Sequence, residues 1–170
     1  LLFFEDDITN KYNPQNKDLR RSYSFFTRDA IANRVNYQDI VSPHTMEVFE
    51  ALKQDKYLWN ADNSINYNAD IFKCVSSNFK NKDLQTTFNA LVSTNSMRPD
   101  LLGAPLIKHV KNAHDDRYMA AYIALDLFYA RLFQVDPTTV TEKPETDKAN
   151  TNKAVKGTPQ NVILNSEKKG

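Results

Sequence analysis

Apolar residues recur every three to four positions along most of the first 136 residues, which is the spacing of one face of an α-helix. Clusters of Asn, Asp, Ser and Pro separate these stretches and favour turns. The pattern predicts about five helices and one shorter piece. They cover residues 18–35, a segment starting at Ser42, a segment starting at Asn68 or Asp70, a segment after Asn81, the short piece 105–110, and residues 113–134.

The same spacing predicts which side chains of each helix face the core, whereas residues 5–17 are polar and rich in turn formers and predict a loop. Ser42 is a suitable N-cap and Pro43 suits the first helical position. The predicted inward residues are Leu19, Tyr23, Phe26 and Ala30; Met46, Phe49 and Leu52; Ile71, Cys74, Val75 and Phe79; Leu84, Phe88, Leu91 and Val92; and Leu125 and Leu132 with the tyrosines of 113–134.

The 113–134 helix carries the clearest signals at its two ends. Asn112 is expected to cap it, with Asp115 and Asp116 in the first turn, where the helix dipole favours carboxylates. Asp136 and Pro137 end it. Asp126 stands alone in an apolar run, and a buried carboxylate has to be paired or protonated.

Glycine usage supports the helical prediction, because only Gly103 precedes residue 157 and sheet-rich domains need glycines for hairpin turns and bulges. From Pro137 onward the chain has no aromatic residue, three prolines and many Thr, Lys and Asn. The sequence therefore predicts an all-α fold, an irregular bundle of about five helices over residues 1–136. Residues 137–170 are predicted to be a flexible tail or linker.

Composition removes several classes of protein. The single cysteine allows no intramolecular disulfide, and no run reaches the roughly 18 apolar residues that span a bilayer. A formal net charge of +1 provides no overall field that would attract nucleic acid or an anionic membrane. The chain lacks a Gly-x-Ser-x-Gly elbow and a phosphate-binding glycine-rich loop, so we expect no cofactor.

A metal-dependent hydrolase is one alternative, because His44, His109, His114 and Asp115 are of the residue types that ligate metals. His109 and His114 are five positions apart, however, and lack the i, i+4 spacing of a ligand pair on a helix. The acidic residues near His114 are explained by a helix start. We therefore expect no metal site.

A nucleic-acid binder is the second alternative, because Arg20, Arg21 and Arg28 alternate with aromatic residues. On a helix, Arg21 and Arg28 share one side, opposite the predicted core positions Tyr23 and Phe26. This arrangement is typical of a solvated helix face, and it disfavours nucleic acid as the partner.

The favoured interpretation is a non-enzymatic helical module that binds a protein partner as a subunit or adaptor. It rests on the absence of catalytic motifs, on the aromatic amphipathic helices and on a tail able to fold on a partner. Large aromatic residues are enriched in binding hot spots. The candidate contact residues are Tyr57, Trp59, Tyr118, Tyr122 and Tyr129.

The first four residues, Leu-Leu-Phe-Phe, are followed at once by Glu5, Asp6 and Asp7, and the sequence does not begin with Met. One interpretation inserts Leu1 to Phe4 into the bundle as an apolar plug. The other makes the chain the extramembrane part of a protein whose apolar anchor lies upstream.

Overall fold

The computed structural model describes residues 1–141, and Pro99 only by its backbone. Within this range it contains seven α-helices and no β-strand, so the all-α prediction is confirmed, while the expected number of about five helices is too low. The helices are α1 (Leu2–Tyr12), α2 (Leu19–Ile31), α3 (Pro43–Lys53), α4 (Asp70–Ser77), α5 (Lys82–Ser93), α6 (Pro99–His109) and α7 (Arg117–Tyr122). Short 3₁₀ turns are η1 (Tyr37–Asp39), η2 (Val110–Asn112) and η5 (Pro137–Thr139).

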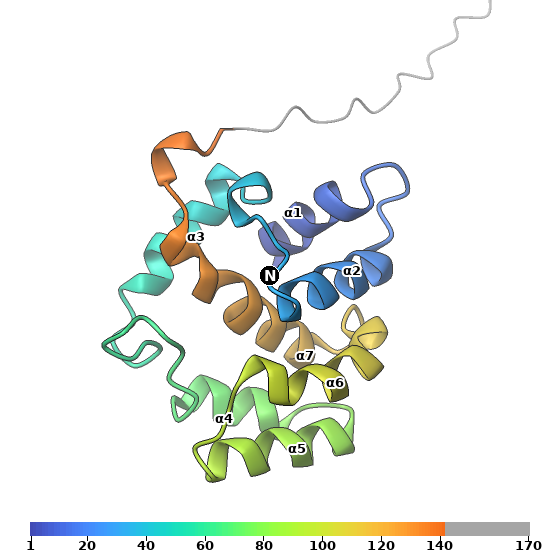
Figure 1. The fold of residues 1–170 in the computed structure, drawn as a ribbon, viewed down its shortest axis with the longest axis vertical. Coiled ribbons are helices and arrows are strands. Elements are labelled where there is room, and N and C mark those ends of the chain that lie inside the picture. The colour runs from blue at the N-terminus through green and yellow to red at the C-terminus, as the bar shows by residue number, and fades with distance from the viewer. Residues whose placement is uncertain (142–170) are drawn as a thin grey trace, which may run out of the picture.

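A central helical rod continues from α7 without a break. The π-helical segment η3 (Ile123–Phe128) follows α7 directly, and the 3₁₀ segment η4 (Tyr129–Gln134) follows η3. Helices α2, α3 and α4 all pack against this rod, which passes between the blue and the green helices in Figure 1. Most of the predicted 113–134 helix is therefore present, but its hydrogen-bond pattern changes twice.

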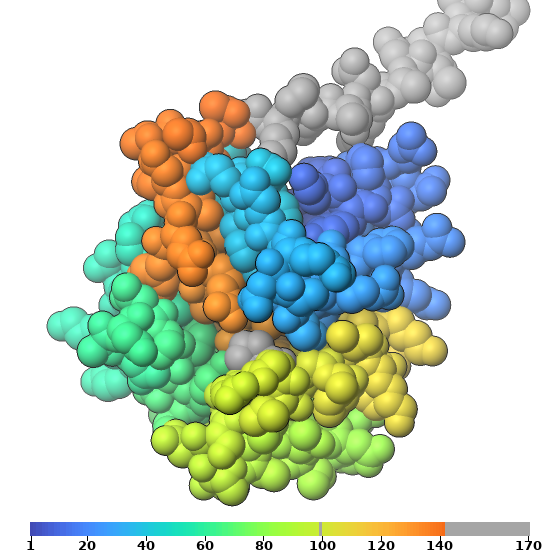
Figure 2. Space-filling model, viewed as in Figure 1, coloured from blue at the N-terminus to red at the C-terminus, as the bar shows by residue number. Residues whose placement is uncertain are grey.

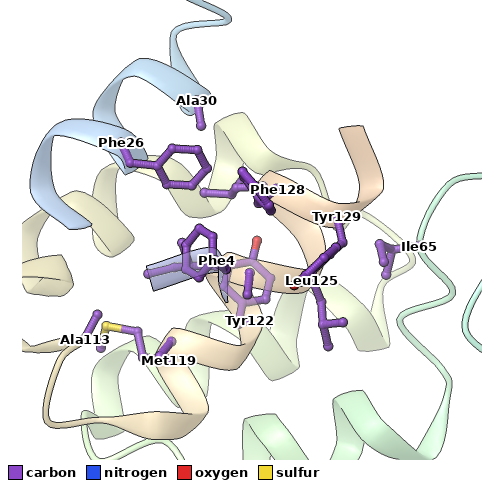
Figure 3. Packing of buried hydrophobic residues seen from close by; sticks show 14 of the residues in the cluster. Phe4, Phe26, Ala30, Ile65, Ala113, Met119, Tyr122, Leu125, Phe128 and Tyr129 are labelled. Atoms are coloured by element: carbon purple, nitrogen blue, oxygen red, sulfur yellow. The ribbon is translucent and has the colours of Figure 1, made fainter. Parts of the chain in front are cut away.

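The predicted loop over residues 5–17 is wrong for its first half, because α1 occupies Leu2–Tyr12. Phe4 is fully buried and its ring lies 5.4 Å from that of Phe26 and 5.0 Å from that of Phe128 (Figure 3). Leu2, by contrast, is 71% exposed, so only part of the apolar start acts as a plug. Three polar residues of α1 are buried, so the sequence does not show the apolar spacing of a helix here; they are Glu5, Asp7 and Thr9.

Helix α4 forms where expected but presents a different face to the core. Phe72, Val75 and Phe79 are buried, whereas the predicted inward residues Ile71 and Cys74 are exposed. Phe72 and Val75 are three positions apart and share a face of α4, while Phe79 lies just beyond its last residue, Ser77. Burying the two phenylalanines removes more apolar area from water than burying Ile71 and Cys74 would.

The start of α7 also differs from the prediction. Asp116, not Asn112, is the N-cap, and its Oδ1 accepts hydrogen bonds from the backbone nitrogens of Tyr118 and Met119, both at 3.2 Å. Its Oδ2 accepts a third, at 2.9 Å, from the backbone nitrogen of Lys80 in the α4–α5 connection. A bond from a distant part of the chain thus fixes where α7 begins.

Asparagines occupy several turn positions with the left-handed backbone conformation that glycine usually adopts. Asn33, Asn63 and Asn95 have φ of 53°, 64° and 51°, in the left-handed region that asparagine tolerates better than most residues. Gly103 has a separate role, since a Cβ there would lie 2.9 Å from Ile31 Cγ2, where α6 packs on α2.

The first residues of the predicted tail belong to the folded body. The Nε2 of Gln38 donates hydrogen bonds to the Asp136 carbonyl at 3.2 Å and to Thr139 Oγ1 at 2.6 Å. Residues 142–170, which hold the rest of the predicted tail, lie outside the described residues. None of the helices within residues 1–141 is long and apolar enough to cross a membrane.

Candidate functional site

The connection between α3 and α4 is the longest stretch of non-helical chain in the described part of the protein. It comprises the sixteen residues 54–69 and lies at the left edge of Figure 1. Loops of this length without helices or strands of their own are uncommon in compact domains, and those that are ordered are usually functional. We call this segment the 54–69 loop.

The 54–69 loop is held in one conformation by its own hydrogen bonds. The backbone nitrogen of Asn60 donates to the Ser64 carbonyl at 2.8 Å, and that of Asn66 donates to the Leu58 carbonyl at 2.9 Å. Leu58 and Ile65 are both buried and fasten the loop to the core. The loop is therefore a preformed structure with an outer and an inner side.

Tyr57 dominates the outer side, with 81% of its surface exposed. Its backbone nitrogen donates to Asp55 Oδ1, and its carbonyl accepts from Asn66 Nδ2, both at 2.9 Å. Beside it lies a hollow of about 330 Å³ that extends to Ala69 and Ile71 at the start of α4. Because Ile71 is 44% exposed, this side presents a large aromatic and an aliphatic side chain to solvent.

The inner side of the loop borders a larger hollow of about 660 Å³, which we call the Arg131 hollow. Loop residues between 60 and 67 line it together with Asn95, Met97 and side chains between 126 and 134. In Figure 2 the green loop and the orange end of the central rod adjoin on the face in view. The π-helical segment contributes to its wall, and such segments are frequently found at functional sites.

Asp126 lines this hollow from the π-helical segment and is only 3% exposed. Its Oδ1 accepts a hydrogen bond from the Tyr67 hydroxyl at 2.7 Å, and its Oδ2 accepts one from the Tyr122 hydroxyl at 2.6 Å. Burial raises the pKa of Asp126 above its ordinary value, against the opposing effect of the two hydroxyls and of Arg131. The carboxyl is thus fixed in place and costly to ionise.

Arg131 lies partly buried in the wall of the hollow, near enough to Asp126 to lower the pKa of that carboxyl. Its guanidinium makes no hydrogen bond and no ion pair within residues 1–141. Arg34, Arg98 and Arg117 differ, because each of them pairs directly with a carboxylate.

The candidate contact tyrosines divide into exposed and buried groups. Tyr57 and Tyr118 are exposed, Tyr118 by 40%, whereas Tyr122 and Tyr129 belong to the core and cannot contact a partner in this conformation. Trp59 is partly buried, and its Nε1 donates to the Leu52 carbonyl at 2.8 Å. The prediction for Tyr122 and Tyr129 is corrected because both sides of the central rod are covered.

The histidines proposed as metal ligands lie on separate segments. His44 on α3 stacks against Phe3, with ring centroids 5.3 Å apart. His109 Nδ1 lies 3.2 Å from Asn81 Nδ2, and His114 Nε2 lies 3.0 Å from Asp115 Oδ2. No three His, Cys, Asp or Glu side chains of the described residues are placed to share a metal ion.

The three arginines of the nucleic-acid alternative all lie on the exposed side of α2. Each has a neighbour in the fold: Arg20 approaches His114 at 3.4 Å, Arg21 lies 3.5 Å from Asp18 Oδ2, and the Arg28 guanidinium lies 5.7 Å from the centre of the Phe25 ring. These contacts are typical of a solvated helix face, and nucleic-acid binding stays an untested prediction.

Sequence analysis missed the unpartnered Arg131, which carries no local signal. The dense turn formers of 59–70 do predict a loop before α4, but not that this loop is ordered or borders two hollows. No family model, curated protein or solved structure matches this chain. Its function has to be inferred from the geometry of the loop and of the hollows beside it.

Proposed function

We propose that this chain is a non-enzymatic interaction module that binds a protein partner through the outer side of the 54–69 loop. The observation that carries the proposal is Tyr57, a large aromatic side chain that is 81% exposed on a loop with a fixed backbone. Tyrosine is enriched among the residues that dominate binding energies.

The fixed backbone matters because ordering a flexible loop on binding costs free energy. Both backbone polar groups of Tyr57 already have partners, in Asp55 and Asn66. A tyrosine has only two side-chain torsions left to order, so it provides contact area at low entropic cost. Tyr57 is therefore suited to act as an anchor in an interface.

The hollow next to Tyr57 indicates what the partner supplies. Ile71 is one of its apolar residues, and Asp55 and Asp70 also line it. A partner segment with an apolar side chain beside a basic one would be complementary to this surface.

Photocrosslinking in the source cells tests this proposal. A photoreactive amino acid replaces Tyr57, or replaces Tyr118 as the competing exposed tyrosine, and crosslinked proteins are identified by mass spectrometry. We expect one defined protein adduct from position 57. Tyr57→Ala and Ile71→Ala should each weaken binding of the purified partner at least about tenfold, as hot-spot residues do.

Phe25→Ala is the matched control, because Phe25 is 43% exposed, as Ile71 is, but lies on α2. It should leave the affinity unchanged. Crosslinks confined to position 118, or a partner whose affinity does not respond to Tyr57→Ala, would refute the proposed surface.

A further inference from the structure

The Arg131 hollow, on the inner side of the 54–69 loop, is not used by the proposed partner surface. Its volume of about 660 Å³ is within the roughly 300–1,000 Å³ range of small-molecule sites. It combines apolar side chains, such as Ile65 and Phe133, with charged and amide groups. Charged, amide and hydroxyl side chains outnumber the apolar ones in its lining, so the hollow suits a small polar ligand rather than an apolar one.

The positive group of the hollow is the guanidinium of Arg131. The Arg131 side chain is partly buried, but none of its nitrogen atoms is among the buried polar atoms without a partner, so the guanidinium is accessible from the hollow. Arg131 has neither a hydrogen bond nor an ion pair within residues 1–141. A guanidinium binds a carboxylate through two parallel hydrogen bonds, and a carboxylate ligand would therefore satisfy it.

The acidic side chains of the hollow are Asp126 and Asp62. Asp126 is held in place by Tyr67 and Tyr122, and its two oxygens keep lone pairs beyond those two bonds. Asp62 is exposed, and its Oδ1 accepts from the backbone nitrogen and the hydroxyl of Ser64 at 3.0 and 2.6 Å. The exposed Asp62 carboxylate would repel a simple anion, whereas it would attract an ammonium group, to which the Asp126 oxygens could offer hydrogen-bond acceptors.

We propose that the Arg131 hollow binds a small zwitterion, a free α-amino acid, with its carboxylate on Arg131 and its ammonium group toward Asp126 and Asp62. The amide side chains of Asn60, Asn95 and Gln134 offer further donors and acceptors. Ile65 and Phe133 provide contacts for an apolar side chain of the ligand.

Calorimetric titration of the full chain with the twenty common amino acids tests this assignment. At least one of them should bind at concentrations up to about 10 mM. For that amino acid, the amine that lacks the carboxylate and the N-acetyl derivative that lacks the ammonium charge should each bind at least about tenfold more weakly. These comparisons use the unaltered protein and do not depend on the folding of any variant.

Arg131→Gln should reduce the affinity at least about tenfold, and Arg131→Lys should not restore it fully, because lysine cannot form the two parallel bonds. Arg34→Gln is the control, since Arg34 pairs with Asp29 on the surface. The assignment is overturned if no amino acid binds, if binding survives Arg131→Gln, or if inorganic phosphate or acetate binds as tightly as the amino acid.

Discussion

Glu5 and Arg117 form an ion pair at 2.6 Å although 112 positions separate them in the sequence. The same Glu5 oxygen accepts a hydrogen bond from the buried Tyr23 hydroxyl at 2.7 Å. One carboxylate on α1 thus connects α2 with the first residue of α7. This connection makes α1 part of the folded body.

We expect Glu5→Ala to lower the free energy of unfolding by about 1–3 kcal/mol or more, because it leaves the buried Tyr23 hydroxyl without a partner. Arg117→Met should also destabilise, because Glu5 then remains as a nearly buried, unpaired charge. Urea denaturation of Glu5→Ala, Arg117→Met and the double variant gives the coupling energy between Glu5 and Arg117. Lys73→Met, which breaks the exposed pair with Asp70, should leave stability nearly unchanged. Additive effects of the Glu5 and Arg117 variants would contradict the pairing.

Asp116 provides a second test of the fold. Asp116→Ala removes the cap of α7 and the acceptor for Lys80, and we expect a loss of about 1–3 kcal/mol in the free energy of unfolding. Asp116→Asn keeps an acceptor at the cap and should cost less. Asn112→Ala, at the cap that the sequence predicted, should stay within about 0.5 kcal/mol of the unaltered protein. The reverse order of effects would place the start of α7 at the earlier residue.

Asp126 should make stability depend on pH in a recognisable direction. Its pKa is raised by burial in the folded protein, whereas in the unfolded chain it returns to about its ordinary value of 3.8. Between these two values the folded state binds more protons, so the free energy of unfolding falls as the pH rises. Above the raised pKa this contribution no longer changes.

Asp126→Asn replaces the titratable carboxyl with an amide. The free energy of unfolding of this variant should therefore decrease less as the pH rises than that of the unaltered protein. Urea denaturation of both proteins at several values between about pH 4 and pH 7 measures the difference. As the pH rises, the free energy of unfolding of Asp126→Asn should increase relative to that of the unaltered protein. Parallel curves would show that the pKa of Asp126 is the same in the folded and unfolded states.

Tyr122 and Tyr129 give opposite expectations for the same substitution. The Tyr122 hydroxyl donates to Asp126, whereas the buried Tyr129 hydroxyl has no hydrogen-bond partner within the described range. Tyr122→Phe should therefore lower the free energy of unfolding by about 1–3 kcal/mol. Tyr129→Phe should leave it unchanged or raise it, since it removes a polar group that is desolvated without compensation. Thermal and urea unfolding of the two variants measure this difference. Equal losses of unfolding free energy in both variants would contradict the different hydrogen bonding of the two hydroxyls.

Cys74 tests the orientation of α4. Because its side chain is exposed, a thiol reagent such as a maleimide should label it in the native protein without denaturant. The inward position that helical spacing alone predicts would instead protect the thiol until the protein unfolds. Labelling followed by mass spectrometry distinguishes these two orientations.

The sequence predicted best where a signal is contained within a few neighbouring residues. Ser42 and Pro43 marked the start of α3 correctly, since Ser42 accepts a hydrogen bond from the backbone nitrogen of Thr45. Tyr23 and Phe26 are buried as their spacing indicated. Asparagine takes left-handed turn positions in a chain with few glycines. Each of these features depends on backbone sterics or on contacts within one helical turn.

The tertiary structure decided the features that depend on partners far along the chain. Glu5 and Asp7 make α1 resemble a polar loop in the sequence. Their burial depends on partners from other elements, which are Arg117 and Tyr23 for Glu5 and Ser42 for Asp7. Figure 3 shows the result, with Phe4 packed among core residues of the central rod.

By itself, then, the sequence determined an all-α protein, because the spacing of apolar residues and the scarcity of glycine favour helices through interactions between neighbouring residues. Folding decided that Tyr57 is exposed while Tyr122 and Tyr129 are buried, and that Arg131 lines a hollow without a partner. The physical reason is that burial and charge pairing depend on which segments meet in space, and residues as far apart as Tyr67 and Asp126 come together only in the folded chain.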